Sequence, residues 1–128
     1  MSFSMKRQLG CTYDEALTLV PEALKTEGFG VLTEIDIKQT LKNKLGVEFR
    51  RYKILGACNP PLAFEALSAT LEIGTMLPCN VIVYEGDDGR AVVHAIDPMQ
   101  TMAVGDPRLA KIAETVHDKL ARVLERLA

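Results

Sequence analysis

The chain has 128 residues, of which 48% are hydrophobic and 25% are charged, and its formal net charge is −2. This length suits one globular domain with a continuous core, so we expect a single domain over residues 1–128. Acids and bases are interleaved, which argues against the basic patch that nucleic-acid binding needs, and 5% aromatic residues without Trp argue against a base-stacking platform.

The sequence predicts neither a signal peptide nor a membrane span. The first ten residues, MSFSMKRQLG, lack a hydrophobic run of signal-peptide length, and no later stretch approaches the ~20 apolar residues of a span. Three cysteines without a CxxC spacing argue against a disulfide framework. We therefore expect a cytoplasmic protein with reduced thiols and no membrane partner.

The first part of the chain predicts two strands, each followed by a helix. Thr12 and Glu15 form a capping box that begins the first helix, and Gly46 ends the second. Pro21 lies inside the first helical pattern, where a kink is expected. The predicted strands cover residues 2–9 and 30–37, and the predicted helices cover residues 12–28 and 36–46.

The second part predicts three strands and two helices. Asn59 followed by Pro60 is typical of a helix start, because asparagine caps the first turn and proline suits its first position. The loop GDDG at residues 86–89 joins two alternating stretches into a hairpin. The predicted strands cover residues 49–58, 79–85 and 90–96, and the predicted helices cover residues 60–70 and 107–127.

The element order βαβαβαββα predicts an α/β (α+β) fold. We expect a two-layer sandwich with a five-stranded mixed sheet and helices packed on it. The hairpin strands carry apolar residues on both faces, Val81 and Val83 on one and Ile82 and Tyr84 on the other. Either the helices divide between the two faces, or a second subunit covers one of them. We expect a homodimer.

Four stretches of the sequence resemble one known family. They are EGFGVLTEID (27–36), LKNKLGVEFRRYKILGACNPPLAFEAL (41–67), IGTMLPCNVIVYE (73–85) and AIDP (95–98). The pair YKILGACNP and LPCNV is the most specific part of the resemblance. The family is the bacterial and archaeal one catalogued as domain of unknown function 302. The resemblance implies a small, dimeric α/β domain to which no biochemical activity has been assigned.

Cys58 lies directly before the predicted cap of the third helix, at the positive end of the helix macrodipole. Such a position lowers thiol pKa values and stabilises anions. One interpretation is therefore a thiolate nucleophile, a redox thiol or a soft metal ligand. The alternative is that Cys58 is a small apolar residue buried as packing.

Cys79 and His94 are predicted to share a face of the hairpin. If GDDG is a four-residue loop, Val81 pairs with His94, and Cys79 is then a diagonal neighbour at ~7–8 Å. A loop of three or five residues would instead place His94 on the face of Asn80, and His94 would then be an ordinary strand residue. Asparagine is depleted in strands, so Asn80 is a candidate for orienting a ligand or bonding a loop.

The distance between Cys58 and Cys79 depends on residues 60–77. One continuous helix over that range would be ~27 Å long and would separate the cysteines. Breaks at Thr70 and Gly74 favour a short helix and a return segment that brings them together. With His94 they would then form a Cys₂His set suited to zinc or copper.

Three functional hypotheses follow from these patterns. The first is a small-ligand or metal-binding homodimeric module, with candidate site residues Cys58, Asn59, Cys79, Asn80 and His94. The second is a structural or interaction domain whose cysteines are only packed. The third is a thiol-dependent enzyme that uses Cys58 as the activated group, with Cys79 or His94 as the resolving thiol or base.

Overall fold

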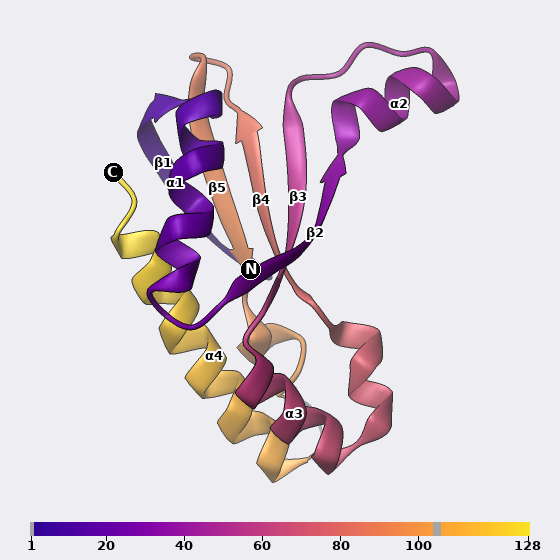
Figure 1. The fold of residues 1–128 in the computed structure, drawn as a ribbon, viewed down its shortest axis with the longest axis vertical. Coiled ribbons are helices and arrows are strands. Elements are labelled where there is room, and N and C mark those ends of the chain that lie inside the picture. The colour runs from indigo at the N-terminus through magenta and orange to yellow at the C-terminus, as the bar shows by residue number, and fades with distance from the viewer. Residues whose placement is uncertain (1, 104–105) are drawn as a thin grey trace.

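The computed structural model describes residues 2–103 and 106–128 and confirms the five predicted strands and four predicted helices in their predicted order. Two short 3₁₀ helices, η1 (Leu71–Met76) and η2 (Pro98–Gln100), complete the described chain (Figure 1). The strands are β1 (Ser4–Thr12), β2 (Gly30–Asp36), β3 (Tyr52–Cys58), β4 (Cys79–Glu85) and β5 (Arg90–Ile96). The α-helices are α1 (Tyr13–Lys25), α2 (Ile37–Leu45), α3 (Pro60–Ala69) and α4 (Pro107–Glu125).

The five strands form one sheet in the order β1-β5-β4-β3-β2. Every neighbouring pair is antiparallel, so the prediction of a mixed sheet is wrong, although the α+β class is confirmed. A parallel neighbour would need a helix that crosses a sheet face. Instead α2 and α3 lie beyond opposite ends of the sheet, and the chain re-enters beside the strand it has just left (Figure 1).

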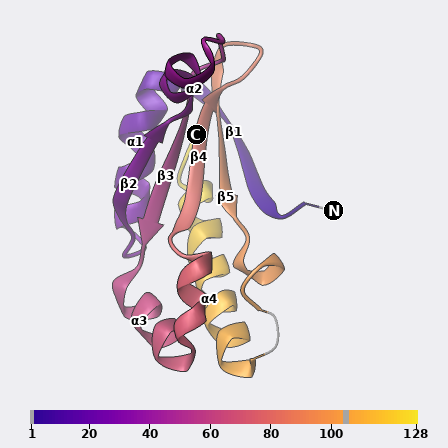
Figure 2. The same cartoon turned by 90° about the vertical axis from the view of Figure 1, so that its right-hand side faces the viewer.

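The helices α1 and α4 cover one face of the sheet (Figures 1 and 2). Alternate residues of the inner strands point into this layer and are almost fully buried. They pack against the apolar stripes that the spacing of the two helices predicts. The strands contribute Leu55, Val81, Val83, Val93 and Ala95, and the helices contribute Val20, Leu24, Val116 and Leu120.

The opposite face of the sheet has no helix packed along it (Figure 2). Tyr52, Tyr84 and His94 form an aromatic ladder on this open face, with ring centroids 5.5 Å apart in the first pair and 5.6 Å in the second. Ile54 and Ile82 lie opposite each other on the same face. Over the described ranges, no helix combines the length and the apolarity that a membrane crossing requires.

The helix ends follow the capping signals of the sequence. Thr12 and Glu15 make the capping box at the start of α1, and Gly46 ends α2 with a left-handed φ of 67°. Pro21 is accommodated inside α1. Because these signals act over three or four residues, they need no knowledge of the tertiary structure.

Thr33 of β2 and Pro78, which directly precedes β4, both lie close to the backbone of Gly56 in β3. A Cβ added there would overlap Oγ1 of Thr33 and lie 2.8 Å from Cγ of Pro78. We expect Gly56→Ala to lower the free energy of unfolding by about 1–3 kcal/mol in urea denaturation.

Gly30→Ala is the matched control, since nothing lies within 4 Å of a Cβ added at Gly30. Its free energy of unfolding is expected to stay within about 0.5 kcal/mol of wild type. Equal effects at Gly56 and Gly30 would contradict the close approach of Thr33 and Pro78.

Candidate functional site

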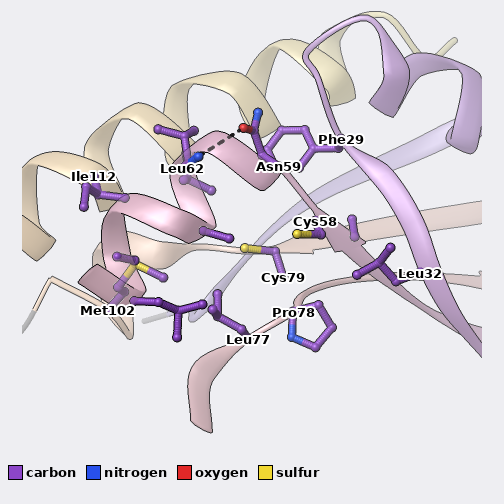
Figure 3. A pocket seen from close by; sticks show the side chains of 15 residues that line it. Phe29, Leu32, Cys58, Asn59, Leu62, Leu77, Pro78, Cys79, Met102 and Ile112 are labelled. Carbon is purple, nitrogen blue, oxygen red and sulfur yellow. Dashed lines mark hydrogen bonds between the residues drawn. The ribbon is translucent and has the colours of Figure 1, made fainter. Parts of the chain in front are cut away.

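An apolar pocket of about 280 Å³ lies where β3 ends, α3 begins and β4 begins (Figure 3). Of the 15 residues that line it, only Asn59 carries an amide or charged side chain. The helix α3 supplies Leu62, Ala63, Ala66 and Leu67, and α4 supplies Ile112 and Val116. The pocket is therefore an extension of the hydrophobic core that reaches the surface.

Both predicted cysteines line this pocket. The helix α3 ends at Ala69, η1 turns the chain back, and β4 starts at Cys79, so the predicted return segment is confirmed. In the register of β3 and β4, Ala57 pairs directly with Cys79, and Cys58 is the next residue of β3. Figure 3 shows both sulfur atoms in the pocket.

The two thiols differ in their surroundings. Cys79 is 8% exposed, whereas Cys58 is half-buried. Burial raises the pKa of the Cys79 thiol to about 11, and the neighbouring Cys58 raises it further in the same direction. Cys79 is therefore a protonated thiol at neutral pH, which argues against it as a resolving thiolate.

The side-chain amide of Asn59 makes two hydrogen bonds at the wall of the pocket. Its Oδ1 accepts the backbone N–H of Leu62 at 3.4 Å, which is the predicted cap of α3. Its Nδ2 donates to the carbonyl oxygen of Glu27 at 3.1 Å and so joins α3 to the segment that follows α1. Asn59 is 9% exposed. The arrangement makes Asn59 a positioning residue for the pocket wall.

The rim of the pocket contains residues that the sequence did not single out. Leu32 of β2 is 68% exposed at the edge of the pocket, and Leu77 and Pro78 border it from the segment before β4. The thioether of Met102 also lines the pocket and is 4% exposed. These residues come from separate parts of the chain, and no local signal marks them.

His94 lies on the open face of the sheet, away from the pocket. It pairs with Ile82, whereas Val81 pairs with Ala95, because five residues separate the paired positions Glu85 and Ala91. The prediction of a Val81–His94 pair is wrong for this reason. A one-residue change of register reverses the face of every side chain in the strand.

The imidazole of His94 is held by neighbours on the open face. Ser4 Oγ is 3.0 Å from Nδ1, and the hydroxyl of Tyr84 is 3.1 Å from Nε2. Burial, and then the ammonium of Lys6, lower the pKa of His94, so the ring is neutral at pH 7. Asn80 is exposed on the same face, opposite Gly56.

The register also separates the Cys₂His set, because Cys79 shares the buried face of Val81 and Ala95, whereas His94 pairs with Ile82 on the open face. Both ring nitrogens of His94 are engaged by Ser4 and Tyr84 rather than by a cysteine. Within residues 2–103 and 106–128, no group of three or more His, Cys, Asp or Glu side chains could hold a metal ion. The site that remains is the apolar pocket with its two thiols.

An antiparallel sheet with helices on one face and an apolar pocket at its end defines a small α+β domain. The family model described as domain of unknown function DUF302 matches residues 5–127. The chain belongs to this family, as the resemblance in its sequence predicts.

A solved structure supports the same assignment. This chain is similar to the protein in the crystal structure of an uncharacterized conserved protein DUF302 from Bacillus stearothermophilus. The alignment covers 100% of this chain and 100% of that chain, with 31% sequence identity and a TM-score of 0.92. No curated protein matches the chain.

Proposed function

We propose that the protein is a binding module whose pocket holds a small apolar molecule. The observation that carries the proposal is the lining of the pocket, which is apolar except for Asn59 and the two thiols. Ligand sites in proteins are concave and mostly apolar, with few polar groups. The exposed side chain of Leu32 at the rim leaves apolar surface for a ligand to cover.

The polar groups of the pocket narrow the class of ligand. Both ends of the Asn59 amide are engaged within the protein, by the N–H of Leu62 and the carbonyl of Glu27. The remaining polar groups are the thiols of Cys58 and Cys79, which are weak hydrogen-bond partners. No charged side chain lines the pocket among the described residues. A charged head group would have to remain outside, so an alkyl chain or an aromatic ring fits best.

The volume sets the size of the ligand. A cavity of about 150 Å³ in another protein binds benzene, which corresponds to roughly 25 Å³ per carbon. At that ratio the pocket of about 280 Å³ accommodates about eleven non-hydrogen atoms. A medium-length alkyl chain or a bicyclic aromatic compound has this size.

Isothermal titration calorimetry with 1-octanol tests the proposal, and ethanol is the control because it is too short to fill the pocket. We expect one 1-octanol per chain, a dissociation constant on the order of 10 µM to 1 mM, and a negative heat-capacity change. Ethanol is expected to give no saturable heat at the same concentrations. Equal heats for both alcohols, or no saturable binding of 1-octanol, would rule out the apolar site.

We further propose that the open face of the sheet binds a second copy of this chain. In β2 to β4, all of which the structure describes, the residues on this face include no Asp, Glu, Lys or Arg. The charged residues of the face lie at its margin, Arg90 at the start of β5 and Lys6 on the edge strand β1. Five strands of about seven residues give a footprint of roughly 550 Å² per copy, or about 1,100 Å² in total, which reaches the size of a specific interface. An apolar centre with charge only at the margin suits an identical face across a twofold axis.

Ile82→Asp tests this interface, because Ile82 lies at the centre of the open face. We expect wild type to sediment as a dimer at tens of micromolar and Ile82→Asp to sediment near the chain mass of 14.1 kDa. Leu71→Asp is the control, since Leu71 is 85% exposed in η1, away from this face. It should remain dimeric. A monomeric wild type would refute the interface.

The state of the thiols supports a proposal for the cellular compartment. All three cysteines are free, including the neighbouring pair Cys58 and Cys79. Free neighbouring thiols are typical of reducing compartments. We therefore propose that the protein acts in the cytoplasm.

A further inference from the structure

We propose that the α2 arm, which comprises α2 and the segment joining it to β3 (residues 37–51), packs on a second copy of this chain. The inference rests on the interface proposed for the open face and deepens it by naming a second contact of the same dimer. Each copy would extend its arm beyond the end of its own sheet and onto its partner.

The arm lies on the side of the sheet where the second copy is proposed to bind. In Figure 1, α2 extends from the sheet in the direction away from α1 and α4. Figure 2 looks onto the open face and shows α2 at one end of it. A second copy packed on the open face would therefore meet the arm at the edge of that face.

The arm has little packing within its own chain. No residue of α2 is buried, and no residue from 32 to 54, all of which the structure describes, belongs to the hydrophobic core. A helix as short as the nine residues of α2 is marginally stable in water without tertiary packing. Contacts with a second copy would supply that packing.

The side chains that the arm leaves exposed are apolar. Leu45 is 69% exposed, Val47 is 44% exposed and Phe49 is 41% exposed. The charged side chains are instead paired within the arm, as shown by the ammonium of Lys38, which lies 3.5 Å from the carboxylate of Glu48. Contiguous apolar surface of this kind marks a site of protein–protein contact.

The apolar surface of the arm continues into the open face. The ring of Phe49 lies 6.2 Å from that of Tyr52, which stacks on Tyr84 in the aromatic ladder. The guanidinium of Arg50 lies over the ring of Tyr84, but its charge is paired with Asp87 at 3.1 Å. One partner can therefore cover the arm and the open face together.

The area of the combined surface fits a stable dimer. The open face alone gives about 1,100 Å², which is near the lower limit for a specific interface. The nine residues of α2 form a helix about 14 Å long and about 10 Å wide, so one side covers roughly 140 Å². Two arms and the partner surfaces that they cover raise the total to about 1,650 Å², the standard size of a stable interface.

Sedimentation equilibrium of Leu45→Ser tests the arm. We expect the dissociation constant of the dimer to rise at least about 30-fold, because two buried leucines are lost per dimer. Leu45→Met keeps an apolar side chain of similar size and should stay within about threefold of wild type. Leu19→Ser is the matched control, since Leu19 is 40% exposed in α1, on the other side of the sheet, and this variant should dimerise as wild type does.

Ile82→Asp, measured in the same series, separates the arm from the open face. If Ile82→Asp dissociates and Leu45→Ser dimerises like wild type, the arm is overturned and the open-face interface stands. If Leu45→Ser dissociates and Ile82→Asp remains dimeric, the arm stands and the open face does not. An equal loss of affinity in Leu19→Ser and Leu45→Ser would also overturn the arm, and a monomeric wild type would overturn both contacts.

Discussion

Replacing Asn59 with alanine is expected to lower the free energy of unfolding by about 2–3 kcal/mol, measured by urea denaturation. The variant loses the cap that accepts the N–H of Leu62 and the donor to the carbonyl oxygen of Glu27. Because Asn59 is 9% exposed, water cannot fully replace either partner. The loss of an N-cap alone accounts for about 1 kcal/mol, and an unpaired carbonyl accounts for the rest.

Asp36→Ala is the matched control for Asn59→Ala. Asp36 caps α2 by accepting the N–H of Gln39 at 3.0 Å, but it is exposed. Its loss should cost only about 1 kcal/mol. If Asn59→Ala costs no more than Asp36→Ala, the hydrogen bond to Glu27 does not hold the pocket wall.

Replacing Ala63 with leucine is expected to weaken binding of 1-octanol by at least about tenfold, which corresponds to about 1.4 kcal/mol. Ala63 is half-buried in α3 and lines the pocket. A leucine there adds three carbon atoms, which would fill about a quarter of the space for roughly eleven. The dissociation constant for 1-octanol is measured by isothermal titration calorimetry under the conditions used for wild type.

Ala69→Leu is the control for Ala63→Leu. Ala69 is also half-buried in α3, but it lies outside the lining of the pocket. We expect its affinity for 1-octanol to match that of wild type. An equal loss of affinity for 1-octanol in both variants would mean that the substitutions act by destabilising α3. Unchanged affinity in Ala63→Leu would show that the alcohol binds elsewhere.

The elements and their order could be predicted because their signals are local. The capping box at Thr12 and Glu15 and the cap at Asn59 each act within a few residues. The return segment was predictable for the same reason, since Thr70 and Gly74 interrupt the helical pattern. From that segment alone, the sequence predicts that Cys58 and Cys79 can meet.

The position of His94 could not be fixed in this way. It depends on the register of the hairpin, and a shift of one residue moves a side chain to the other face. The GDDG loop allowed several registers, and the one observed pairs Glu85 with Ala91. The sequence therefore grouped His94 with the cysteines, whereas the structure places it beside Ser4 and Tyr84.

The walls of the pocket were also beyond prediction from the sequence. Leu32, Met102 and Ile112 come from three distant parts of the chain and look like ordinary core residues in their local patterns. Only the antiparallel pairing of all strands, with α3 beyond the end of the sheet, brings them around the cysteines. The cysteines therefore marked the place of the site, and the packing defines its shape.

Mapping of backbone amide chemical shifts during a titration with 1-octanol tests the binding pocket most directly. The account predicts that the largest shifts occur at Cys58, Ala66 and Cys79, which line the pocket. The amides of Tyr84 and His94, on the open face, should move little. Shifts centred on Tyr84 and His94, or no saturable shift at Cys58 and Cys79, would contradict it.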